Sequence, residues 1–237
     1  TAARLGAQVG NTLGAFSDPV LEDPKEYFQA YKDVEDSLVR MTKYAKEKNV
    51  LFGYEQMYTP TQGMWTINGC VELLKQILAR ANAPMYLTID TAHQAGQHMF
   101  LKPTVEEIEA MQSNRTVRMS YLPKAIQELI IKEENVRKIH SMLDKYNYWF
   151  AEPEDGDVYK WLSRLGCYSP IVHLQQTDGT YSSHKPFTEQ YNNSGIIKPK
   201  EVFTAIKASY DREEETGMPP RVGEIYLAFE VFFNVMD

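Results

Sequence analysis

Four short apolar runs in this sequence each end on, or just before, an acidic residue or a histidine. These residues are Glu55, Asp90, His173 and Glu230. Longer amphipathic stretches separate the runs, and such alternation is typical of parallel strands with helical crossovers. Because the carboxyl ends of parallel strands meet at one edge of a sheet, we expect the four side chains to lie close together. The pattern therefore restricts the chain to the α/β class.

The expected elements follow from hydrophobic spacing. Apolar residues in 23–48 recur at helical intervals, and Pro24 suits the first turn of that helix. Residues 104–150 are longer than one crossover needs, and we expect a helical insertion there with breaks around Asn114 and Pro123. Strands are expected at 7–16, 50–57, 84–90, 169–176 and 224–233, and the other helices at 68–81, 157–165 and 198–214.

Five strands are too few to close a (β/α)8 TIM barrel, which needs about 250 residues as a single domain. The chain has 237 residues, starts at Thr1 rather than Met, and opens on a segment that resembles the end of a helix. An open five-stranded barrel would also leave apolar edges exposed. We therefore expect residues 1–237 to be the C-terminal five β/α units of a single barrel domain whose N-terminal strands precede Thr1. An open sheet is the alternative.

Charge and cysteine usage limit the partners. The net charge is −7, and no basic stripe suited to nucleic acid is present. No apolar run approaches the roughly 20 residues of a membrane span. The two cysteines, Cys70 and Cys167, form no CxxC pair, so we expect free buried thiols and a cytoplasmic protein. The expected partners are a small molecule and further copies of the chain in a homo-oligomer, with no nucleic acid and no membrane.

The residues at the strand ends are the kinds that bind a metal ion. A buried carboxylate is costly unless it is paired or bound to a cation. Two Glu, one Asp and one neutral His suit Mn²⁺, Mg²⁺, Co²⁺ or Zn²⁺. Taken singly, a Glu that ends a strand is more often a solvated residue at the rim than a ligand, and a lone His in a strand is more often a hydrogen-bonded core residue. The combination at four strand ends favours a metal site.

Four local motifs give the sequence a family resemblance. They are Gly53-Tyr54-Glu55, Ile89-Asp90-Thr91-Ala92-His93, Val172-His173-Leu174-Gln175 and Phe229-Glu230-Val231-Phe232. In this order they resemble the xylose isomerase-like barrel superfamily, which includes ketose 3-epimerases acting on sugars or sugar phosphates, related sugar isomerases and the endonuclease IV enzymes. The Asp-x-x-His step is the most specific of the four. In that superfamily the matching strands are the last five of eight.

The resemblance implies residue roles. Glu55, Asp90, His173 and Glu230 would hold one divalent metal ion, with Mn²⁺ as the first choice, and His93 would contact a substrate oxygen. Glu55 and Glu230 would act as acid and base on opposite faces of a carbon beside a ketose carbonyl, through an enediolate. Glu224, at the start of the same strand, is the alternative to Glu230, but its position favours a structural role at the bottom of the barrel.

Two further features are candidate substrate contacts. The segment 182–187 contains His184 and Lys185, which could hold an anionic group such as phosphate, or could simply form a polar loop. Trp65 could form one wall of a sugar pocket or belong to the core.

Other functions use the same residues. An aldose–ketose isomerase would move the proton between adjacent carbons of the sugar. A nuclease of the endonuclease IV type needs a His-rich three-metal cluster and a basic face, which five histidines and the acidic charge disfavour. A barrel-derived binding protein that lacks its N-terminal strands is the alternative without catalysis.

Overall fold

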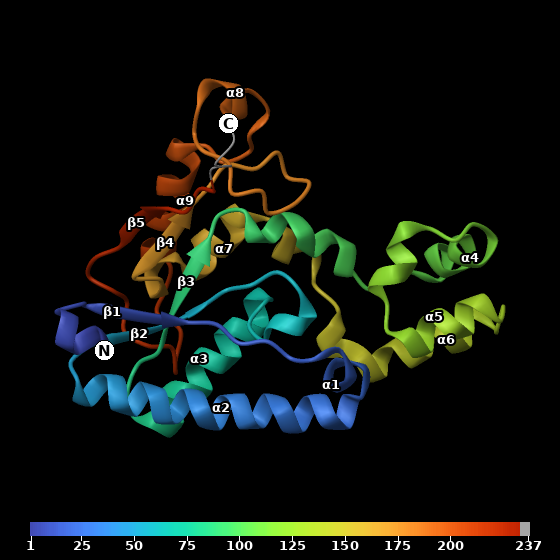
Figure 1. The fold of residues 1–237 in the computed structure, drawn as a ribbon, viewed down its shortest axis with the longest axis horizontal. Coiled ribbons are helices and arrows are strands. Elements are labelled where there is room, and N and C mark those ends of the chain that lie inside the picture. Colours follow the sequence, from blue (N-terminus) through green and yellow to red (C-terminus); the bar gives the residue numbers. More distant parts are fainter. Residues whose placement is uncertain (233–237) are drawn as a thin grey trace.

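A curled sheet of five parallel strands forms the centre of the computed structural model, which describes residues 1–232. The spatial order of the strands equals their order in the sequence, so each connection crosses over a face of the sheet (Figure 1). The strands are β1 (Val9–Thr12), β2 (Leu51–Glu55), β3 (Tyr86–Asp90), β4 (Ile171–Leu174) and β5 (Tyr226–Phe229). This arrangement confirms the α/β class and is part of a TIM barrel.

Helices fill the crossovers between the strands. The α-helices are α1 (Asp18–Glu22), α2 (Pro24–Glu47), α3 (Ile67–Ala81), α4 (Val105–Ser113), α5 (Lys124–Ile131), α6 (Val136–Met142), α7 (Val158–Leu165), α8 (Glu189–Ser194) and α9 (Pro199–Asp211). The 3-10 helices are η1 (Ala2–Leu5), η2 (Pro60–Gln62), η3 (His93–Phe100), η4 (Val117–Tyr121), η5 (Leu143–Trp149), η6 (Pro153–Gly156) and η7 (Gly166–Tyr168). Within the described residues, no helix is both long and apolar enough to cross a membrane.

The two faces of the sheet differ in polarity because side chains alternate along a strand. One face presents Phe52, Leu87, Ile89 and Val172, all buried in a core shared with α3 and α7. The next residues along β2, β3 and β4 therefore point to the opposite face, and these include Glu55, Asp90 and His173. The alternation thus places the polar strand ends inside the curl of the sheet.

The helical segment 104–150 packs in a second hydrophobic cluster, which includes Ile108, Ile126 and Ile139 together with Leu21 of α1 and Tyr27 of α2. Figure 1 shows α4, α5 and α6 grouped away from the strands. The segment meets the rest of the chain near the start of α2, where the Tyr27 and Tyr148 rings stack with centroids 3.8 Å apart. The first turn of α4 is held by a reciprocal capping box between Thr104 and Glu107.

Most elements lie where the sequence predicts them, although the strands are shorter. The first expected strand, 7–16, is reduced to Val9–Thr12, the four residues that pair with β2. The last one was expected to end at Phe233, which lies outside the described residues. The short helices α1 and α8 and the 3-10 helix after Asp90 were not expected. Both cysteines are free and buried, as predicted.

Candidate functional site

Glu55, His173 and Glu230 meet at the carboxyl end of the sheet. Glu55 ends β2, His173 lies in β4, and Glu230 directly follows β5. Nδ1 of His173 lies 3.3 Å from Oε1 of Glu55 and 2.7 Å from Oε2 of Glu230. One potential ligand atom from each residue lies within 4.8 Å of the others. The fold therefore brings these three residues together, and their roles stay predictions.

Two atoms of this cluster are buried without a hydrogen-bond partner. They are Nδ1 of His173 and Oε2 of Glu230, which lie close together but lack the angles of a hydrogen bond. Buried polar atoms without partners are rare and call for a physical explanation. An imidazole nitrogen and carboxylate oxygens that converge in this way fit the donor set of a divalent transition-metal ion.

The side chains of this cluster also shift one another's pKa values. Burial raises the pKa of Glu230, the neighbouring His173 opposes that shift, and Asp90 and Glu55 add to it. Burial lowers the pKa of His173, but the neighbouring Glu55, Glu230 and Asp90 outweigh burial and leave the pKa above its ordinary value. Several acidic groups thus compete for protons in one small volume, which a bound cation would relieve.

Asp90 lies beside this group and is completely buried. Its carboxylate, with His184 and Glu230, forms a second set of potential ligand atoms within 4.8 Å of one another. Oδ1 accepts a hydrogen bond from the backbone N–H of Ala92, at 2.8 Å. The side-chain amide of Gln175 donates to both carboxylate oxygens, at 2.7 and 2.8 Å. Glu230 belongs to both sets of potential ligand atoms. The two sets therefore form one cluster, which contains all four predicted ligands.

The two other predicted histidines also lie near one another. His93 is 4% exposed, and its Nδ1 lies 2.8 Å from the backbone oxygen of Gln56. His184 is half-buried, and its Nδ1 lies 3.3 Å from the backbone oxygen of Glu230. The ring centroids of the two histidines are 6.2 Å apart. A backbone carbonyl at Nδ1 favours the tautomer that leaves Nε2 free to accept or to bind a cation.

Lys185 and Trp65 have different surroundings from the histidines. Nζ of Lys185 lies 5.2 Å from the centroid of the Tyr191 ring, beside a small polar cavity of about 250 Å³. Trp65 is buried, packs edge-on against Phe100, and lines another cavity of about 230 Å³. The contacts of both residues are thus with neighbours other than the carboxylates, and their roles toward a substrate stay predictions.

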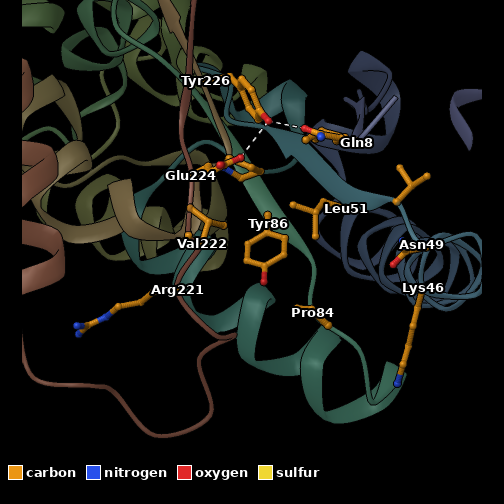
Figure 2. A pocket seen from close by; sticks show the side chains of 14 residues that line it. Gln8, Lys46, Asn49, Leu51, Pro84, Tyr86, Arg221, Val222, Glu224 and Tyr226 are labelled. Carbon is orange, nitrogen blue, oxygen red and sulfur yellow. Dashed lines mark hydrogen bonds between the residues drawn. The ribbon is translucent and has the colours of Figure 1, made fainter. Parts of the chain in front are cut away.

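Glu224 lies at the amino end of β5, as its position in the sequence predicts. It lines a cavity of about 540 Å³ together with residues from the amino ends of the other strands. Figure 2 shows Glu224 and Gln8 both bonded to the hydroxyl of Tyr226, which donates to Oε2 of Glu224 at 3.2 Å. Glu224 is therefore held at the opposite end of the strand from Glu230.

Two amide residues around the carboxylates were missed as contributors to the site. Nδ2 of Asn11, in β1, donates to Oε2 of Glu55 at 3.2 Å. Gln175 holds Asp90 and was noted only as part of a motif. The available signal for Asn11 is an amide side chain within the short strand β1, whose residues are Val-Gly-Asn-Thr. The amide of Gln175, just after β4, had no sequence signal of its own.

Comparisons with known proteins bear on the fold. No family model matches the sequence. A 56-residue stretch is 36% identical to the D-erythrulose 1-phosphate 3-epimerase of Brucella abortus (strain 2308), and it covers 24% of this chain and 18% of that protein. The structure of a candidate xylose isomerase from Rhodospirillum rubrum aligns over the whole of this chain and 58% of its own, with a TM-score of 0.62 at 14% identity.

A xylose isomerase domain-containing protein from Salmonella typhimurium LT2 aligns with a TM-score of 0.42 at 9% identity, over 98% of this chain and 57% of its own. The chain thus spans little more than half of each solved structure that it resembles. The chain therefore has the fold of the Rhodospirillum structure, and a short stretch of its sequence is similar to the Brucella epimerase.

Proposed function

We propose that this chain carries the site of a metal-dependent sugar or sugar-phosphate epimerase that inverts a centre beside a ketose carbonyl. The observation that carries the proposal is the pair of carboxylates, Glu55 and Glu230, that both approach Nδ1 of His173, where this nitrogen and Oε2 of Glu230 are buried without a hydrogen-bond partner. The 36% identity to a ketose-phosphate 3-epimerase over 56 residues supports the same class of reaction.

Glu55, Asp90, His173 and Glu230 would hold one divalent metal ion, with Mn²⁺ the first candidate. Its contribution when bound would be to polarise the substrate carbonyl and its neighbouring hydroxyl as a Lewis acid. His93 would donate to or accept from a substrate oxygen. The segment with His184 and Lys185 would contact an anionic group, if the substrate is phosphorylated.

The two glutamates would then do the proton chemistry. One of them would remove the proton from the carbon beside the carbonyl, which leaves an enediolate. The other would deliver a proton to the opposite face of that carbon, and the centre would be inverted. Two separate carboxylates are needed, because a single base tends to return its proton to the same face. Asn11, which donates to Oε2 of Glu55, would hold that carboxylate in place.

Metal removal tests the proposal most directly. The protein that carries this chain should lose turnover of ketoses or ketose phosphates after EDTA treatment, and Mn²⁺ or Co²⁺ should restore it. The screen should include D-erythrulose 1-phosphate alongside free ketoses, with metal added. Full activity in chelated, metal-free protein would contradict the proposed site.

An aldose–ketose isomerase with the same site is the second candidate, supported by the structural likeness to a candidate xylose isomerase. Reaction in D₂O separates the two. An epimerase places solvent deuterium on the carbon whose configuration changes, whereas an isomerase that works by proton transfer places it on the carbon that ceases to be the carbonyl carbon. NMR of the product locates the label.

A further inference from the structure

Gln175 connects the carboxylate of Asp90 to the segment 182–187. Its side chain is completely buried directly after β4. Nε2 donates to Oδ1 and Oδ2 of Asp90, and Oε1 accepts a 2.5 Å hydrogen bond from the backbone N–H of His184. Both ends of this one amide are therefore occupied, one by a predicted metal ligand and the other by the loop that contains a predicted substrate contact.

These contacts fix the orientation of the amide. The Asp90 carboxylate can only accept hydrogen bonds, and the His184 N–H can only donate one. The amide of Gln175 therefore cannot be flipped, because that would exchange its oxygen and its nitrogen. The backbone of Gln175 is held as well: its N–H donates to Oγ1 of Thr91, and its carbonyl accepts from the same hydroxyl, each at 3.1 Å. Gln175 is thus held on both backbone and side chain.

The loop residue at the other end is held in an unfavourable conformation. His184 has a φ of 47°, in the left-handed region that non-glycine residues rarely adopt. Its carbonyl accepts from the backbone N–H of Phe232 at 3.0 Å, and its ring stacks on Phe232 with centroids 4.1 Å apart. The bond from Gln175 completes this set, so that His184 faces Asp90 and Glu230 at the cost of backbone strain.

We propose that Gln175 is a positioning residue that orients the Asp90 carboxylate toward the metal ion and holds His184 against the same site. This inference rests on the metal site of the proposed function. Groups that orient a ligand by hydrogen bonding typically change metal affinity by about 10- to 100-fold when they are removed. Loss of the Gln175 amide should therefore weaken metal binding and loosen the His184 loop together.

The neighbouring Gln176 offers a matched control. It is also buried, and its amide anchors the chain after α8 through the backbone N–H and carbonyl of Ile197, at 2.9 and 3.1 Å. Its side-chain hydrogen bonds go to Asn192, Thr177 and Ile197 and not to Asp90. Gln175→Met and Gln176→Met thus remove buried glutamine amides of equal size, and only the first removes a partner of Asp90.

The test measures Mn²⁺ binding by isothermal titration and amide hydrogen exchange at His184, in the folded protein that carries this chain. Gln175→Met should raise the Kd for Mn²⁺ by about 10- to 100-fold and speed exchange of the His184 amide even without metal. Gln176→Met should lower the thermal transition but leave the Kd at the wild-type value. If Gln175→Met does not fold, Gln175→Asn shortens the side chain, keeps it polar, and should raise the Kd in the same way.

The outcomes separate the two proposals. Wild-type protein that binds none of Mn²⁺, Co²⁺, Mg²⁺ and Zn²⁺ would overturn the metal site and this inference with it. Wild-type protein that binds Mn²⁺, with equal Kd values for the Gln175 and Gln176 variants, would overturn the inference alone.

Discussion

The arrangement of individual atoms at the ends of β2, β4 and β5 gives the site its chemistry. Nδ1 of His173 and Oε2 of Glu230 are buried and lack hydrogen-bond partners, a costly state that a cation would relieve. Glu55 is more firmly held, because Asn11 occupies its other oxygen. The two glutamates thus differ in freedom, which suits a pair in which each acts on a different face of a substrate.

Substitution of the two glutamates tests their roles. Glu55→Gln and Glu230→Gln should each lower turnover by about 10²- to 10⁴-fold, the usual contribution of a positioned acid or base. Glu224→Gln is the control, since it changes the same kind of residue at the other end of β5. Steady-state kinetics and circular dichroism on the three variants would show this. Near-normal turnover in either of the first two variants would refute the assigned roles.

At the scale of single residues, the sequence identified the carboxylates and His173 because of an elementary constraint. A charged group at the end of an apolar strand must either reach solvent or find a partner, and parallel strands bring such ends together. This constraint does not predict the positions of Asn11 and Gln175 in the site, because an amide carries no charge that must be compensated. Their role depends on which carboxylate lies opposite, and that is known only once the strands are in register.

At the scale of the elements, the connection between β4 and α9 is held by buried side-chain contacts. Gln176 anchors it by accepting from Ile197 N–H and donating to its carbonyl, and Gly195 packs directly against the Gln176 side chain. The sequence placed this loop between a strand and a helix but did not predict α8 within it. Local helices of this length depend on tertiary contacts rather than on spacing.

Gly195→Ala should therefore destabilise the protein, since a Cβ there would overlap the Gln176 side chain. An overpacked position of this kind costs about 1–3 kcal/mol in the free energy of unfolding. Gly223→Ala should cost far less, because nothing lies within 4 Å of a Cβ at that position. Urea unfolding compares the two variants. Equal midpoints would show that the close packing at Gly195 does not affect the free energy of unfolding.

At the scale of the whole molecule, the described part of the chain has an apolar strand at its edge. β5 pairs only with β4, and Phe229 is 71% exposed. It lines a cavity of about 570 Å³ with Leu227, Phe187 and residues of α9. The sequence predicted this exposure from the count of strands, because five strands of a barrel plan leave edges that three further strands would cover.

The isolated 237-residue chain should therefore self-associate at micromolar concentration. Phe229→Lys should reduce this association at little cost to the fold, because the side chain is mostly exposed. Sedimentation velocity on the chain and on the variant gives the distribution of masses. A wild-type chain that sediments as a monomer at these concentrations would show that the exposed strand is protected in solution.

The hydrophobic cluster around residues 104–150 has a consequence for engineering. Ile108, Ile126 and Ile139 pack in a cluster that is separate from the core between the sheet and α3, and that includes Leu21 and Tyr27 from the preceding helices. We therefore expect that changes among these isoleucines disturb the strands little. A library meant to alter substrate range could be diversified in this segment first, with the carboxylates left in place.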